Sequence, residues 1–175
     1  VLGLVLPALL LQPAAAAEQL PPATQWLSED AVFAVELSKP KELLDLVLNP
    51  KVTEAVTAMP VYKQAAAQPK FQEFLQVIKY LELQLGTDWK TGLHKLVDGG
   101  ITWGVTPNGG NLLIIDAQDK KTLDQLHEIF LTFAKGEAAK RGQPDRVASA
   151  DYRGVTGWTF GDGEAHAILG NRLLL

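Results

Sequence analysis

The chain has 175 residues, a formal net charge of −4 and no cysteine. This mildly acidic composition, without a basic stripe, argues against nucleic acid or an anionic lipid surface as a partner. The absence of cysteine excludes disulfides, thiol catalysis and thiolate metal sites, so the fold has to depend on its apolar core.

Residues 1–17 have the pattern of the latter part of a secretory signal peptide. The uncharged run VLGLVLPALLL is followed by Gln12, Pro13 and four alanines, which suit a signal peptidase. The basic region that usually comes first is missing, and about ten apolar residues are too few to span a bilayer. A short buried helix is the alternative. We expect a signal-peptide remnant of an exported protein, periplasmic or secreted, and a longer chain that continues beyond Leu175.

The domain proper is expected over residues 31–175, after a polar, proline-containing lead-in at 18–30. Residues 31–37 (AVFAVEL) predict a strand that is apolar on both faces, which indicates a central, covered position. Ser38 is expected to cap a helix over 39–48. Asn49 and Pro50 end that helix and open a second one, to about residue 59, before Pro60 and Pro69 interrupt the chain again.

Two longer helices and a hairpin are predicted in the middle of the chain. Residues 70–85 have helical spacing of apolar side chains, with Gly86 as the stop, and Thr87 is expected to cap a short helix to Val97. Residues 101–106 then alternate as a half-buried strand, and a tight turn at 107–110 leads into the partner strand 111–116. The second clear helix covers 120–135, with Asp119 as a candidate cap, and 136–145 is expected to be a polar, mobile connection.

The remaining residues predict a three-strand meander over 146–152, 155–160 and 164–169. The fold class is therefore α+β: an antiparallel sheet made of an N-terminal strand, a hairpin and a meander, covered on one face by helices. The hairpin, the following helix and the next strand resemble half of a ferredoxin-like split unit.

No catalytic, cofactor-binding or metal-ligating residue is predicted. His94, His127 and His166 are not spaced as metal ligands, and His127 is placed on the polar flank of its helix, so all three are interpreted as solvated or structural. The sequence has no Gly-x-Ser-x-Gly elbow. Both glycine pairs lead into strands, which indicates turns and not phosphate loops.

Aromatic side chains in the strands are the candidate ligand-binding residues. Trp103 and Trp158 each lie near glycines in a predicted strand, and Tyr152 and Phe160 could join them. An aromatic patch on an open sheet face can bind a glycan or a peptide. The alternative is that these rings fill the core between the helices and the sheet.

The chain resembles a loose group of uncharacterised exported bacterial proteins. The resemblance lies in the phrase DAVFAVELSKPKELLD at 30–45, the segment GGITWGV with LLIIDAQDKKTLDQL between 99 and 126, the step Tyr152-Arg153-Gly154, and the turn GNRL at 170–173. It implies an exported protein of unknown function, with no catalytic residues to carry over.

The leading hypothesis is a non-enzymatic exported domain that acts through its surface on another protein or a cell-envelope glycan, as part of a longer chain. One alternative is half of a hydrolase-like enzyme, with a cleft lined by Asp116, His166 or Tyr152 and completed by residues beyond 175. The other alternative is a glycan- or peptide-binding module that uses Trp103 and Trp158.

Overall fold

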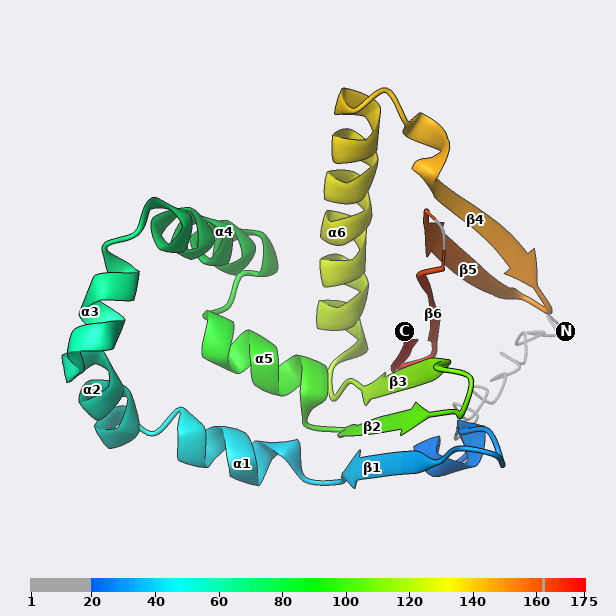
Figure 1. Ribbon diagram of the computed structural model, residues 1–175, viewed down its shortest axis with the longest axis horizontal. Helices are drawn as coiled ribbons and strands as arrows, with labels where there is room; N and C mark the ends of the chain where they lie inside the picture. Colours follow the sequence, from blue (N-terminus) through cyan, green and yellow to red (C-terminus); the bar gives the residue numbers. More distant parts are fainter. Residues whose placement is uncertain (1–19, 162) are drawn as a thin grey trace, which may run out of the picture.

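The computed structural model describes residues 20–161 and 163–175, so the predicted signal remnant lies outside the described residues. These residues form a seven-stranded antiparallel sheet with helices on one side (Figure 1), which confirms the α+β class. The strands are β1 (Phe33–Leu37), β2 (Gly100–Val105), β3 (Asn111–Asp116), β4 (Val147–Tyr152), β5 (Val155–Phe160), β6 (Ala165–Leu169) and β7 (Arg172–Leu174). The helices are α1 (Pro40–Val47), α2 (Pro50–Ala58), α3 (Pro60–Ala66), α4 (Pro69–Leu85), α5 (Trp89–Val97) and α6 (Lys120–Lys140), with short 3-10 helices at Ala23–Trp26 and Pro144–Arg146.

Helices α1 to α4 form an arm that leaves the sheet after β1 and curves away from it, and α5 brings the chain back to β2 (Figure 1). Each of the four arm helices begins at a proline. Proline suits the first helical position because its ring presets the backbone angle and its missing N–H would have had no partner there. Helix α3 was not predicted, since Pro60 was interpreted only as an interruption.

The helix ends partly match the predicted caps. Gly86 ends α4 in the left-handed conformation, with φ of 63°, as predicted. Asn49 and Asp119 accept hydrogen bonds from backbone N–H groups at the starts of α2 and α6. The predictions for Ser38 and Thr87 were wrong: Lys39 precedes α1 without a side-chain cap, and the Asp88 carboxylate caps α5. A carboxylate can accept several N–H groups at once, which a threonine hydroxyl does less well.

The strand order in the sheet is β1-β2-β3-β7-β6-β5-β4. The predicted hairpin (β2–β3) and meander (β4–β5–β6) are both present, and β7 joins the two parts by pairing with β3 and β6. Strands β7, β6 and β5 lie between β3 and β4, so the β3–α6–β4 crossover is split more widely than in a ferredoxin-like unit. Figure 1 shows β1–β3 and β4–β6 running at a steep angle to each other, as the twist of a large sheet requires.

Strand β1 does not occupy the central, covered position that its apolar sequence predicted. It is an edge strand that pairs only with β2 among the described residues. Phe33 and Val35 are nearly half exposed, and the Phe33 ring packs edge-on against Trp103 with 5.5 Å between ring centroids. An apolar run of this length indicates a strand, but it does not say which strands will flank it.

The lead-in covers the face of the sheet that the helices leave free. Ala23 is buried there, and the Leu27 side chain lies over β2 at Gly104, where a Cβ atom would come within 2.7 Å of the leucine. Any side chain at position 104 would therefore require Leu27 to shift. Residues 20–27 are thus part of the packed domain and not a separate leader.

An ion pair between the buried Arg172 and the partly buried Asp116 stabilises the same face of the sheet. The Arg172 guanidinium donates to both carboxylate oxygens of Asp116, at 2.7 and 3.0 Å, across the β3–β7 pair. It also donates to the Pro21 carbonyl oxygen at 2.7 Å and lies 5.1 Å from the centre of the Trp26 ring. One side chain therefore links two strands to the lead-in.

Helix α6 continues five residues past its predicted end, through a segment that had been expected to be mobile. Ala138 is buried, and the backbone N–H of Gln143 donates to its carbonyl oxygen. Glutamate, alanine and lysine after Gly136 are good helix formers, so the one glycine does not stop the helix.

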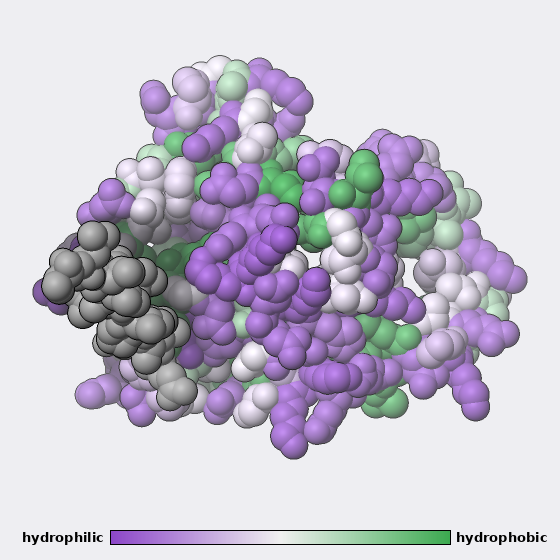
Figure 2. All heavy atoms as spheres, turned by 180° about the vertical axis from the view of Figure 1, so that it is seen from behind, coloured by the Kyte–Doolittle hydropathy of each residue, from purple (hydrophilic) through white to green (hydrophobic). Residues whose placement is uncertain are grey.

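The arm leaves much of its apolar surface exposed. Helices α2, α3 and α4 contain no fully buried residue. Seen from behind, the surface is mostly hydrophilic, with hydrophobic areas at intervals (Figure 2). The exposed large apolar residues of the arm are Leu43, Leu46, Val47, Val52, Val56, Met59, Val61, Phe74, Leu75, Val77, Tyr80 and Leu83.

Candidate functional site

A cavity of about 760 Å³ forms a groove between α6 and the sheet, here called the α6 groove. One side of α6 forms its first wall, and β3, β6, β7 and the β5–β6 turn form the second. Its lining is mainly apolar: Leu112, Leu123, Leu126, Phe130, Phe160, Ala165, Leu173 and Leu175, with Asn111, His127, Gly163, Glu164 and His166.

Two histidines meet inside the α6 groove. His127 comes from α6 and His166 from β6, and their Nε2 atoms are 2.8 Å apart, which is a hydrogen bond. His166 is buried and His127 is partly buried. The residues are 39 positions apart in the sequence, so only the packing of α6 on the sheet brings them together.

Strand register and helical spacing explain why these two side chains face each other. His166 is directly opposite Trp158 across the β5–β6 pair, so both project toward α6. His127 lies four residues after Leu123 and three before Phe130, which places it on the side of α6 that faces the sheet. The prediction that His127 lies on the polar flank of its helix was therefore wrong.

Aromatic rings surround the histidine pair. The Phe160 ring stacks on His166 at a centroid distance of 4.9 Å and an interplanar angle of 7°, and Phe130 packs edge-on against Phe160 at 5.1 Å. Trp158 packs edge-on against His127, and the Lys135 ammonium lies 4.6 Å from the centre of the indole. This cage keeps water away from the pair on several sides.

Burial makes both histidines less basic than usual. It lowers the pKa of His127 below the ordinary 6.5, and the nearby carboxylates of Glu128 and Asp124 only partly oppose this effect. Burial also lowers the pKa of His166, and the neighbouring His127 lowers it further. Both imidazoles are therefore mostly neutral at pH 7.

The hydrogen bond between two neutral imidazoles requires opposite tautomers. The donor carries its hydrogen on Nε2, and the acceptor, whose Nε2 lone pair is used, carries its hydrogen on Nδ1. The pair thus has one free nitrogen lone pair and one free N–H group. Its remaining hydrogen-bonding capacity is therefore one acceptor and one donor.

Metal binding has little support from the described residues. No cluster of three or more histidine, aspartate or glutamate side chains occurs among them. The two histidines alone fall short of the three protein ligands typical of a catalytic zinc site.

The structure separates the three aromatic residues that were predicted to bind a ligand. Trp103 is in β2 and Trp158 is in β5, with β3, β7 and β6 between them. Trp103 is 43% exposed beside Phe33, whereas Trp158 is partly buried under α6 next to His127. Tyr152, at the end of β4, is 70% exposed and has the Arg153 guanidinium over its ring.

The residues suggested for an enzymatic cleft do not converge either. Asp116 is engaged by Arg172 on the face covered by the lead-in, whereas His166 projects toward α6 on the opposite face. Tyr152 lies at the far end of the edge strand β4.

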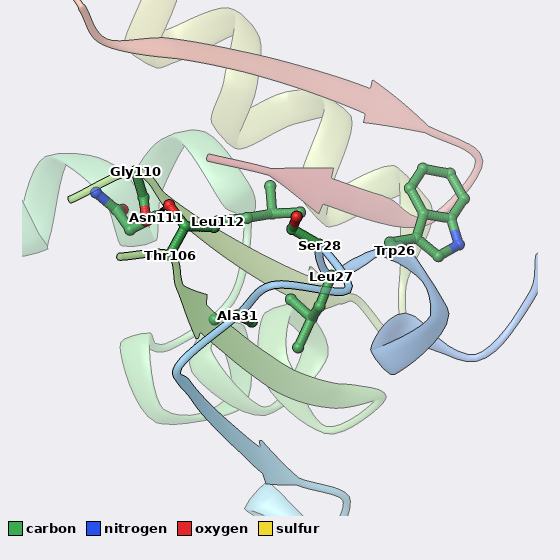
Figure 3. A pocket seen from close by; sticks show the side chains of 9 residues that line it. Trp26, Leu27, Ser28, Ala31, Thr106, Gly110, Asn111 and Leu112 are labelled. Carbon is green, nitrogen blue, oxygen red and sulfur yellow. Dashed lines mark hydrogen bonds between the residues drawn. The ribbon is translucent and has the colours of Figure 1, made fainter. Parts of the chain in front are cut away.

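A second, smaller cavity of about 330 Å³ lies between the lead-in and the β2–β3 hairpin (Figure 3). The Trp26 indole is at one end of it, Thr106 and Asn111 are at the other, and Leu27 lies between them. None of its lining side chains is ionisable. It offers shape but no acid–base chemistry, so the α6 groove is the better candidate site.

Sequence reasoning missed the histidine pair because it examined spacing along the chain. One signal was available: His166 alternates in phase with Ile168, and His127 sits among Leu123, Leu126 and Phe130 at helical spacing. Two histidines on core-facing positions of separate elements are candidates for contact.

Comparisons with known proteins do not assign the chain to a family. No family model, no curated protein and no solved structure matches it. Within the described residues, no helix is both long and apolar enough to cross a membrane.

Proposed function

We propose that this domain is a non-enzymatic binding module that holds an apolar ligand with one polar end in the α6 groove. The observation that supports the proposal is the groove itself. Its size is within the range of about 300–1,000 Å³ that is usual for ligand sites, and its walls are mainly apolar with a few convergent polar groups.

The two kinds of lining suggest how such a ligand would bind. Its apolar part would lie against Leu126, Phe130 and Leu173, and removal of this surface from water would supply most of the affinity. Its polar end would reach the histidine pair, which offers one donor and one acceptor. The small number of polar groups fixes orientation more than affinity.

A neutral fluorescent probe, N-phenyl-1-naphthylamine, tests the proposal. We expect saturable binding with increased fluorescence. Leu126→Trp places an indole in the groove and should weaken binding by about tenfold, or roughly 1.4 kcal/mol. Leu83→Trp, on the exposed surface of α4, is the matched control and should leave binding unchanged. Equal affinity in both variants, or equal loss in both, would overturn the proposal.

The exposed Phe33–Trp103 pair supports a second candidate, a glycan- or peptide-binding surface on β1 and β2. Exposed aromatic rings bind the flat apolar faces of sugars and the side chains of peptides. Oligosaccharides of the cell envelope should then quench tryptophan fluorescence in the wild type and much less in Trp103→Leu. No difference between the two proteins would contradict this candidate.

The proposal includes export of the chain before it acts. Its support is the apolar and alanine-rich pattern of residues 1–17. Expression with a complete leader, followed by N-terminal sequencing of the exported protein, should give a start at or near Glu18. An unprocessed N-terminus inside the cell would contradict export.

A further inference from the structure

We propose that the His127–His166 hydrogen bond is a two-proton latch that holds α6 against β6 and opens the α6 groove in acid. The consequence for ligand access rests on the proposed function; the latch itself does not. One added proton leaves the hydrogen bond in place, and a second breaks it.

The position of the hydrogen bond makes it suitable for this role. Among the described residues it is the side-chain hydrogen bond that joins α6 to the sheet. The other contacts at this level are edge-on ring contacts, Phe130 with Phe160 and with His166, and His127 with Trp158, and none of them is a hydrogen bond between N–H and a ring nitrogen. Loss of the bond therefore removes the side-chain hydrogen bond between the helix and β6 and leaves the ring contacts to hold the two elements together.

Proton counting explains why the latch needs two protons. In the neutral pair, one Nε2–H donates to the other Nε2. A first proton on the free Nδ1 of the donor ring gives an imidazolium whose Nε2–H still donates, and a charge-assisted bond of this kind is stronger. A second proton must occupy the accepting Nε2. Two N–H groups and two positive charges would then face each other across 2.8 Å, and the rings must separate.

The carboxylates near the pair favour protonation of His127, whereas a charge on His127 opposes protonation of His166. On α6, Asp124 and Glu128 raise the pKa of His127, and the Lys135 ammonium lies over Trp158 beyond it. From the β5–β6 turn, Glu164 lines the groove. Arg172 of β7 is engaged by Asp116 on the opposite face. Strand β5 contributes the neutral Trp158 and Phe160.

The pH range follows from the direction of the shifts. Burial lowers the pKa of both histidines in the folded state. Below pH 6.5, the ordinary pKa of histidine, the unfolded chain therefore binds more protons than the folded protein does. The free energy of unfolding is therefore unaffected above about pH 7 and decreases as the pH falls through 6.5 toward the folded-state pKa values. We expect the groove to open at the acid end of this pH range, where the second proton binds.

Histidine side-chain NMR of the whole protein, without ligand, tests the latch. Near pH 7, His127 and His166 should show opposite tautomers, and on acidification they should titrate in two steps more than about one pH unit apart. Contacts between the Phe130 and Phe160 rings should persist through the first step and disappear at the second.

Two independent single-step titrations, or ring contacts that survive the second step, would overturn the latch. The double variant His127→Phe, His166→Phe keeps aromatic rings in the cage but cannot bind protons, so its ring contacts should not change with pH. If the ring contacts of this variant were also lost in acid, the histidines would not be responsible. Because none of these measurements needs a ligand, they can succeed even if the naphthylamine probe fails to bind.

Discussion

The helical arm α1–α4 and the sheet with α6 stabilise their structure in different ways. Helices α2, α3 and α4 bury no residue fully, and Leu83 of α4 is 79% exposed. In the sheet, Ile114 is completely buried between β2 and β7, and α6 buries Leu123 and Leu131. The arm depends mainly on proline starts and local helical bonds, with α1 and α4 in contact with α5, whereas the sheet region is held by contacts between many distant segments.

This difference shows why the candidate site lies where it does. A groove with a fixed shape needs walls that do not move relative to each other. The α6 groove is formed by elements that share a core, whereas the arm offers apolar side chains without a second wall among the described residues. Rigid elements position binding groups more accurately than loosely packed ones.

The largest effect is expected from breaking the Asp116–Arg172 ion pair, whose arginine is buried. Arg172→Met should leave the Asp116 carboxylate without its partner and lower the free energy of unfolding by about 3–5 kcal/mol. Denaturant unfolding followed by circular dichroism measures this loss. The double variant Asp116→Leu, Arg172→Met should recover much of it, because no uncompensated charge remains. If Arg172→Met had no effect, the ion pair would not be a main link of the sheet region.

A core truncation compares the two regions directly. Ile114→Ala creates a cavity at a fully buried site and should cost about 2–5 kcal/mol. Leu83→Ala removes a similar side chain from the arm and should change the free energy of unfolding by less than about 0.5 kcal/mol. Equal costs at the two positions would show that Leu83 is covered in solution, for example by another segment or molecule.

Between pH 7.5 and pH 5, the acid response should come mainly from the sheet region. As the pH falls below 6.5, the free energy of unfolding of the wild type should decrease, because burial lowers the pKa of His127 and His166. The double phenylalanine variant at these positions should lose most of this dependence. Urea unfolding at pH 7.5 and pH 5 measures it, and an unchanged pH dependence in the variant would remove the histidines as its cause.

The smallest signal, but the most detailed, comes from native-state hydrogen exchange. Amides of α2, α3 and α4 should exchange through local openings of low free energy, and amides of β3 and β7 only near global unfolding. If both groups of amides were equally protected, the arm and the sheet would form one cooperative unit. The contrast between the two regions would then be wrong.

The local structure followed closely from local sequence signals. The hairpin at residues 107–110, the meander and the Gly86 helix stop depend on turn chemistry and apolar period, which act within a few residues. The caps were less well predicted, since Asp88 competed with Thr87 for the same role. Helix α3 was missed because a proline can begin a helix as well as end one.

By itself, the sequence determined the α+β class, most strand and helix positions and the lack of disulfides, because all of these depend on composition and short-range periodicity. Only the tertiary structure decided that β1 is an edge strand, that the lead-in covers the second face, and that His127 meets His166. These features depend on which distant segments pack together. Which segments pack together depends on how much apolar surface each arrangement buries, and the spacing of residues along the chain does not show this.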